Sequence, residues 1–123
     1  MSFKKKKIIH IITDLDTGGA EIMLCKLLSF LNDDKLKFMV VSLMARGKVT
    51  RQIELLGIKV EALDLVQGER PSWQTIKKLR QIMRAFNPDI VQGWMYHGNI
   101  AATVAVFLFD PMCRKVKLFW NVR

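Results

Sequence analysis

Two short segments of the sequence combine residue types that could bind a polar ligand. The first, residues 14–21, runs Asp-Leu-Asp-Thr-Gly-Gly-Ala-Glu and follows an apolar run. Gly18 and Gly19 stand where a helix should begin, so their backbone could approach a ligand and offer amide groups to phosphate. The segment matches neither the dinucleotide-binding glycine pattern nor the P-loop, so it favours neither NAD binding nor ATP hydrolysis. The two glycines also suit a tight strand-to-helix turn without a ligand.

The second segment, residues 92–99, runs Gln-Gly-Trp-Met-Tyr-His-Gly-Asn and follows another apolar run. Polar aromatic side chains in a strand-to-helix loop are more often ligand contacts than core residues, which favours Tyr96, His97 and Asn99 as substrate-binding residues. His97 could also exchange a proton or stabilise developing charge near neutral pH. A single histidine can equally be a hydrogen-bonded structural residue. His10 lies within a strand pattern and is expected in the core.

The elements that must position these segments alternate along the chain. Strands are expected at residues 7–12, 38–43, 58–65, 89–92 and 116–122, and helices at 20–31, 49–56, 72–86 and 99–109. The third helix should begin after Ser72 and end before Pro88, and its buried stripe should be Ile76, Leu79, Met83 and Phe86. This alternation predicts an α/β fold with a doubly wound, mostly parallel five-stranded sheet and helices on both faces. The expected strand order, 3-2-1-4-5, brings both segments to the carboxyl ends of neighbouring strands, where such sheets bind ligands.

The 123-residue chain is strongly basic, with a formal net charge of +9. Over residues 70–123 there are nine basic and two acidic side chains. Such a field attracts phosphorylated substrates or an anionic membrane surface, although a merely solvated basic surface is an open alternative. Nucleic acid is not expected, because no recognition motif accompanies the charge. The expected membrane-surface residues are Lys4, Lys5, Lys6, Lys7, Lys77, Arg80 and Arg84.

The remaining composition bounds the class of protein. The length suits one domain, residues 1–123. Cys25 and Cys113 lack metal-ligand spacing, so neither a disulfide framework nor a metal site is expected, and both should behave as small buried hydrophobes. The apolar runs are too short or too interrupted for a signal peptide or a membrane span. A cytoplasmic protein is therefore expected, with peripheral attachment to the inner face of the membrane as a further expectation.

Three runs of the sequence together resemble the N-terminal domain of GT-B glycosyltransferases. They are residues 8–21 (IIHIITDLDTGGAE), 89–99 (DIVQGWMYHGN) and 120–123 (WNVR). The most similar group is glycosyltransferase family 4, particularly its members in bacterial polysaccharide assembly. The resemblance covers essentially the whole chain. It implies a Rossmann-like domain that forms the acceptor-side half of a two-domain enzyme.

The resemblance also implies a chemistry. The parent enzyme would be a hexosyltransferase that moves a sugar from a nucleotide sugar to a glycan or lipid-linked acceptor with retention of configuration, without a cofactor or an essential metal. Gly18 and Gly19 match the glycine pair near the donor's diphosphate and sugar. His97 matches the histidine that faces the transferred sugar and is the expected catalytic residue. Arg123 matches a position that faces the cleft between the two halves.

One departure from the family pattern limits the expected activity. The paired-glutamate motif that holds the donor lies in a C-terminal domain, which these residues do not include. We therefore expect the isolated chain to transfer no sugar, and we expect the missing donor-binding domain to be its partner. Two alternatives remain open: a standalone nucleotide- or phosphosugar-binding module that needs a partner chain, and a non-functional truncated frame. The sugar, the nucleotide, the acceptor and the linkage are not identified by these residues.

Overall fold

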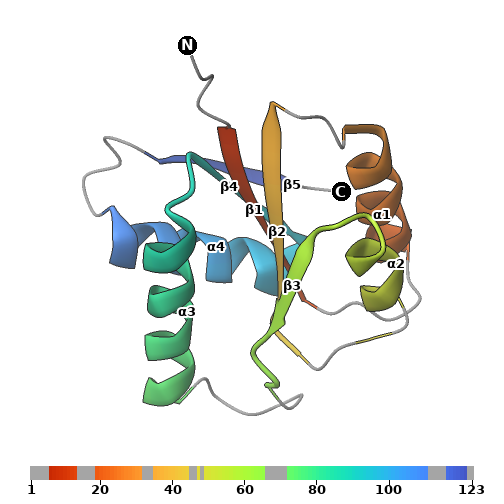
Figure 1. Ribbon diagram of the computed structural model, residues 1–123. Helices are drawn as coiled ribbons and strands as arrows, with labels where there is room; N and C mark the ends of the chain where they lie inside the picture. Colours follow the sequence, from red (N-terminus) through yellow and green to blue (C-terminus); the bar gives the residue numbers. More distant parts are fainter. Residues whose placement is uncertain are drawn as a thin grey trace.

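The computed structural model describes residues 6–13, 19–31, 35–44, 47, 49–65, 72–110 and 116–121. The strands and helices alternate along the chain, as the apolar patterning predicts (Figure 1). The strands are β1 (Lys6–Ile12), β2 (Leu36–Ser42), β3 (Lys59–Ala62), β4 (Ile90–Trp94) and β5 (Lys117–Asn121). The helices are α1 (Gly19–Leu31), α2 (Thr50–Glu54), α3 (Trp73–Phe86) and α4 (Met95–Phe109).

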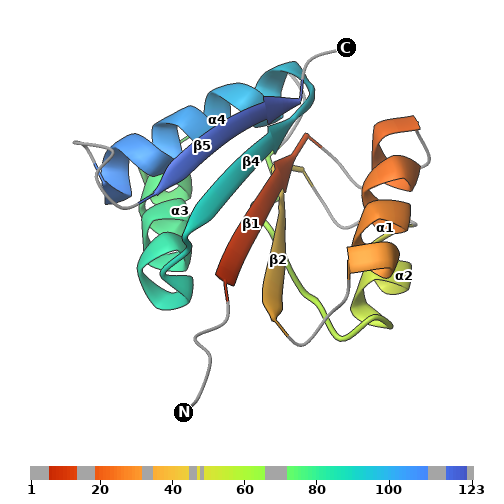
Figure 2. The same cartoon turned by 90° about the horizontal axis from the view of Figure 1, so that it is seen from above.

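The sheet confirms the predicted doubly wound topology. All neighbouring strands pair in parallel, in the order β3-β2-β1-β4-β5. Figure 2 shows α1 and α2 on one side of the sheet and α3 and α4 on the other. This arrangement is that of a Rossmann-like fold, in which the chain runs outward from β1 to one edge and then returns to build the other half. The strand at residues 59–62 lies at an edge, as its alternating pattern predicted.

Local sequence accounts for the ends of α3. The Ser72 hydroxyl accepts a hydrogen bond from the backbone N–H of Thr75 at 3.2 Å, so Ser72 is the predicted N-cap. At the other end Asn87 adopts a left-handed conformation with φ of 56°, and Pro88 follows it. Of the predicted buried stripe, Ile76 is only half-buried, whereas Ile82 is buried in addition to the remaining members.

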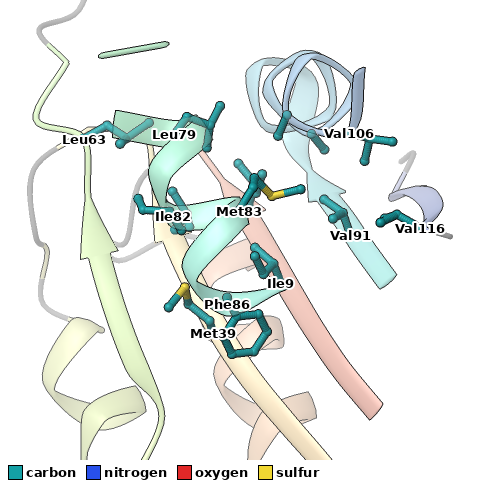
Figure 3. Close-up of a cluster of buried hydrophobic side chains, with 14 of the residues drawn as sticks. Ile9, Met39, Leu63, Leu79, Ile82, Met83, Phe86, Val91, Val106 and Val116 are labelled. Atoms are coloured by element: carbon teal, nitrogen blue, oxygen red, sulfur yellow. The ribbon is translucent and has the colours of Figure 1, made fainter. Parts of the chain in front are cut away.

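Two apolar clusters hold the helices on the sheet. On one face, Ile9 and Ile11 of β1 pack with residues from α3 and α4. Figure 3 shows the buried side chains of α3 (Leu79, Ile82, Met83 and Phe86) gathered over the sheet. On the other face, Ile12 packs beneath α1 and α2 with Leu24 and Leu28. Because β1 is central and buried on both faces, its side chains supply both clusters, as its continuous apolar run requires.

The expectation for the cysteines is confirmed only in part for Cys25, which packs against the apolar cluster beneath α1 and α2. This free thiol is only partly buried, and its Sγ donates to Oε1 of Gln52 at 3.7 Å. The reason is its place on the flank of α1 that faces α2, rather than on the stripe that faces the sheet. Cys113 lies outside the described residues.

Candidate functional site

The two segments singled out by their chemistry follow neighbouring strands that end together. Parallel pairing places Ile12, the last residue of β1, beside Trp94, the last residue of β4. Helix α1 begins at Gly19 and α4 begins at Met95. Both helix starts therefore lie beyond the carboxyl edge of the sheet. They follow β1 and β4, the neighbouring strands at which the order of the sheet changes direction. In doubly wound sheets this position is where ligands bind.

The second segment differs from its predicted form. It was expected to be a loop before a helix at residue 99, but β4 continues to Trp94 and α4 begins at the next residue. Gln92 and Gly93 belong to the strand, and Asn99 lies in the second turn of the helix. The polar residues of this segment are typical of a loop, which made the sequence pattern misleading. In the structure the backbone of residues 92–94 pairs with β1, and α4 follows directly.

Several predicted site residues cannot be assigned a side-chain position. Gly18 and Arg123 lie outside the described residues, as do Lys4 and Lys5. The backbone of Gly19, Tyr96 and His97 is helical, but the side chains of Tyr96 and His97 lie outside the description. Their proposed roles in binding and catalysis therefore stay predictions. What the backbone establishes is that Tyr96 and His97 occupy the first turn of α4.

A hydrogen-bonded chain joins two of the three runs in the sequence resemblance. Nε1 of Trp120 in β5 donates to the Thr103 hydroxyl at 3.0 Å. That hydroxyl donates in turn to the backbone carbonyl of Asn99 at 2.9 Å. The half-buried Asn99 is thus connected to the last strand through its own helix. The fold brings the Asn99 and Trp120 regions together although they are far apart in sequence.

His10 is buried as expected, and it contacts the residue that precedes α4. Nε1 of Trp94 donates to Nδ1 of His10 at 2.9 Å, and Phe38 packs at 5.7 Å between ring centroids. Burial lowers the pKa of His10 from 6.5 to about 4, because the charged imidazolium would lose its hydration. The ring is therefore neutral at pH 7. Because Nδ1 accepts a hydrogen bond, the proton of the neutral ring belongs on Nε2.

Two polar atoms near this edge are buried without a hydrogen-bond partner in the described part of the chain. They are Nε2 of His10 and the hydroxyl oxygen of Thr13, the residue directly after β1. Such groups are uncommon in folded proteins, and each calls for a physical explanation such as water or a ligand. Sequence reasoning missed Thr13, although its position as the first polar residue after the central strand was a usable signal.

The first turn of α1 adds a buried acid to the same edge. Glu21 is only 2% exposed, although carboxylates are rarely buried so completely. A negative charge at this end of a helix is favoured by the unpaired backbone N–H groups of the first turn. Glu21 is the last residue of the first sequence segment, and nothing in its local pattern indicated that it would be buried.

The predicted basic surface is only partly described. Lys77, Arg80 and Arg84 are exposed on α3, which contains no acidic residue. At the amino ends of β1 and β2, Nζ of Lys7 lies 5.9 Å from the centroid of the Phe86 ring, and Nζ of Lys37 lies 5.8 Å from it. These latter lysines are at the edge of the sheet opposite the candidate site. Lys7 and Lys37 are thus distant from the site, whereas Lys77 adjoins Lys78, whose Nζ donates to the carbonyl of Ala62 at the carboxyl end of β3.

Within the described ranges, no three or more His, Cys, Asp or Glu side chains are grouped so that they could hold a metal ion. None of the described helices has the length and apolar character needed to cross a bilayer.

No protein-family model matches the chain, and no curated protein matches its sequence.

Proposed function

We propose that this chain is the acceptor-side domain of a retaining glycosyltransferase. The enzyme would move a sugar from a nucleotide sugar to a glycan or lipid-linked acceptor, with most of the donor held by another domain. The observation that carries the proposal is the pairing of Ile12 with Trp94, because it puts the starts of α1 and α4 at one edge of a doubly wound sheet. Both helix starts contain motifs of the family that the sequence resembles.

The buried, unpartnered polar atoms support a polar ligand at this edge. A sugar or diphosphate carries many hydrogen-bond donors and acceptors, and it would enter a region that contains the Thr13 hydroxyl. Backbone amides at the start of α1, including those of Gly18 and Gly19, would hold the diphosphate.

Roles for the remaining residues follow from their positions and from the resemblance. Tyr96, Asn99 and Arg123 would bind the substrates, while His97 would face the transferred sugar and stabilise charge that develops during transfer. His10 would act as a positioning residue, because it holds Trp94 directly before the turn that carries His97.

A lipid-linked acceptor would require the domain to approach a membrane. The exposed basic side chains of α3 support an anionic membrane surface as a second partner, because each is worth about 1 kcal/mol of attraction near such a surface. They would work together with Lys4 to Lys7 at the start of the chain.

The exposed apolar side chains of α1 favour a second candidate function. Ile22 and Met23 are each 46% exposed, and Phe30 is 86% exposed. This surface suits a nucleotide- or phosphosugar-binding module that pairs with another chain. The two candidates differ in their ligands: the module binds a free nucleotide or phosphosugar, whereas the acceptor-side domain prefers the acceptor.

Amide NMR titration of the purified chain distinguishes the candidates. A short-chain polyprenyl-diphosphate-linked sugar should shift the amides of residues 19–21 and 95–99, and a nucleotide sugar alone should shift them weakly. Tyr96→Ala should weaken the response to the acceptor, whereas Trp73→Ala, which removes an exposed aromatic residue from α3, should leave it unchanged.

Each alternative result has a defined meaning. Saturable binding of the nucleotide sugar without the acceptor would favour the module. Silence towards both ligands would contradict both proposals. Sugar transfer by the chain alone, abolished by His97→Ala, would contradict the expectation that a further domain is needed.

A further inference from the structure

Helix α3 exposes a row of basic side chains that begins with a tryptophan. Trp73, the first residue of the helix, is 78% exposed. Exposed basic residues follow it four, seven and eleven positions later, at Lys77, Arg80 and Arg84. At 3.6 residues per turn these four positions lie within an arc of about 60°. They therefore form one row along the helix, which we call the basic row.

Helix α4, which packs against α3 on the same side of the sheet (Figure 2), exposes an apolar row. None of its residues, Met95–Phe109, is charged. Ile100, Val104 and Phe107 are nevertheless exposed, and Phe107 is the most exposed of them at 66%. Their spacing of four and three residues places them on one side of the helix. A surface helix normally turns polar residues outward, so an outward apolar row needs an apolar environment to be favourable.

The basic row lies on the part of α3 that borders α4. Figure 3 shows Met83 on the side of α3 toward Val106 of α4, and Ile82 on the side away from it. Around the helix axis, Arg80 and Trp73 are about 60° and 80° from Met83, but about 160° and 180° from Ile82. We call the combined region the outer helical face; it consists of Trp73, Lys77, Arg80 and Arg84 of α3 and of Ile100, Val104 and Phe107 of α4.

Charge distinguishes this face from the helices on the other side of the sheet. Neither α3 nor α4 contains an acidic residue, whereas α3 contains four basic ones. Helices α1 and α2 also expose apolar side chains, but there Lys26 and Arg51 are offset by Glu21 and Glu54. Among the described helices, only α3 and α4 combine a clear excess of positive charge with exposed apolar side chains. This combination is typical of surfaces that bind anionic membranes.

We propose that the outer helical face docks on an anionic lipid bilayer, with Phe107 and Trp73 inserted among the head groups. Lys77, Arg80 and Arg84 would contact lipid phosphates, and each would strengthen binding about fivefold. This inference rests on the proposed function, whose membrane partner was supported by charge alone. It adds apolar insertion to that partner and assigns α4 to the docking surface.

The position of Trp73 relates the docking surface to the candidate site. Nζ of Lys78 donates to the carbonyl of Ala62, at the carboxyl end of β3, at 2.8 Å. Trp73 precedes Lys78 by five residues, so it lies about 7.5 Å further along the helix, at the end of the domain where the strands end. An indole combines an apolar body with a polar N–H and is favoured at membrane interfaces. Insertion of Trp73 would therefore hold the end of the domain that contains the site close to the lipid.

Co-sedimentation of the purified chain with lipid vesicles tests the proposal. The chain should bind vesicles of phosphatidylglycerol and should not bind vesicles of phosphatidylcholine. Phe107→Gln should weaken binding at least about tenfold without any change of charge, because burying even about 60 Å² of apolar surface corresponds to that factor. Phe30→Gln is the matched control, since it makes the same change at a phenylalanine that is 86% exposed on α1, and it should leave binding unchanged.

A second pair of variants tests the tryptophan. Trp73→Ala should also weaken binding to phosphatidylglycerol vesicles, whereas Leu55→Ala should not. Leu55 is the matched control because it is an apolar side chain of similar exposure, 76%, directly after α2 on the other side of the sheet. Circular dichroism should show that all four variants are folded, since every substituted side chain is exposed.

Three results would overturn the proposal: equal binding by Phe107→Gln and Phe30→Gln, equal binding to the two kinds of vesicle, or binding to neither. The last result would indicate that a protein, rather than a bilayer, covers the outer helical face. The vesicles contain neither acceptor nor nucleotide sugar, so this result is independent of the NMR titration. Silence in that titration, together with vesicle binding that depends on Phe107, would contradict the proposed sugar transfer and leave the docking surface in place.

Discussion

The indole of Trp94 donates a hydrogen bond to Nδ1 of His10 at 2.9 Å, across the central pair of strands. The contact lies next to the start of α4, and His10 is buried, with 3% of its surface exposed. The hydrogen bond thus connects a titratable imidazole to Trp94, the residue directly before α4. Its consequences for stability can be measured without knowing any ligand.

Acid should destabilise the fold through His10. The pKa of His10 is about 4 in the folded chain and 6.5 in the unfolded chain, so the unfolded state binds the proton more tightly. The stabilisation is complete above pH 6.5 and is lost as the pH falls towards 4. Between pH 7.5 and pH 4.5 we expect a loss of about 2–3 kcal/mol in the free energy of unfolding, measured by urea titration. His10→Gln should remove this part of the pH dependence; an unchanged profile would contradict the assignment.

Trp94→Phe should destabilise the chain more than Trp120→Phe. The first change removes the donor to buried Nδ1 of His10 and leaves that atom unsatisfied, which costs about 1–3 kcal/mol. The second removes a hydrogen bond to Thr103 at a tryptophan that is 55% exposed, where water can replace the partner. Equal losses in urea denaturation would argue against a structural role for the His10 contact.

Ser72→Ala should lower the free energy of unfolding by about 1 kcal/mol, because α3 loses the acceptor for its Thr75 N–H. Ser29→Ala is the matched control. Its hydroxyl donates to the carbonyl of Lys26 from an exposed position within α1, so its removal should change stability by less than about 0.5 kcal/mol. If both variants lose the same stability in thermal denaturation, the capping explanation fails.

The basic face of α3 should control binding to anionic vesicles. Reversing Lys77, Arg80 and Arg84 to Glu should weaken co-sedimentation with phosphatidylglycerol vesicles on the order of a hundredfold, since each basic residue contributes about 1 kcal/mol. Reversing the exposed Lys26, Lys35 and Arg51 makes the same charge change on other elements and should have a smaller effect. Binding that is equal for both triple variants, or insensitive to salt, would contradict the proposed membrane surface.

Local patterns were sufficient for most of the fold. The central strand was recognisable from its continuous β-branched run, and α3 from Ser72 at one end and Asn87-Pro88 at the other. Both signals can be read locally in the sequence: a strand that will be buried on two faces has an unbroken apolar run, and a cap acts within one helical turn. The strand order followed from the alternation of elements, because right-handed crossovers leave few other topologies.

The candidate site was predicted only in part. The sequence indicated which segments belong at the carboxyl edge, but it placed the start of α4 several residues too late. Whether residues 92–94 form a loop or a strand depends on pairing with β1, a contact between segments more than 80 positions apart. No local propensity contains that information.

By itself the sequence determined the class of fold, the order of the strands and the pair of segments that meet at their ends, because periodicity and caps act over a few residues. Only the tertiary structure decided that Thr13 and His10 would each keep a buried polar atom without a partner. It also decided that Glu21 would be fully buried and Cys25 only partly. It also decided that α4 would expose its apolar stripe beside β5. Burial and hydrogen bonding of a side chain depend on which distant segments pack against it, and that is a property of the assembled layers.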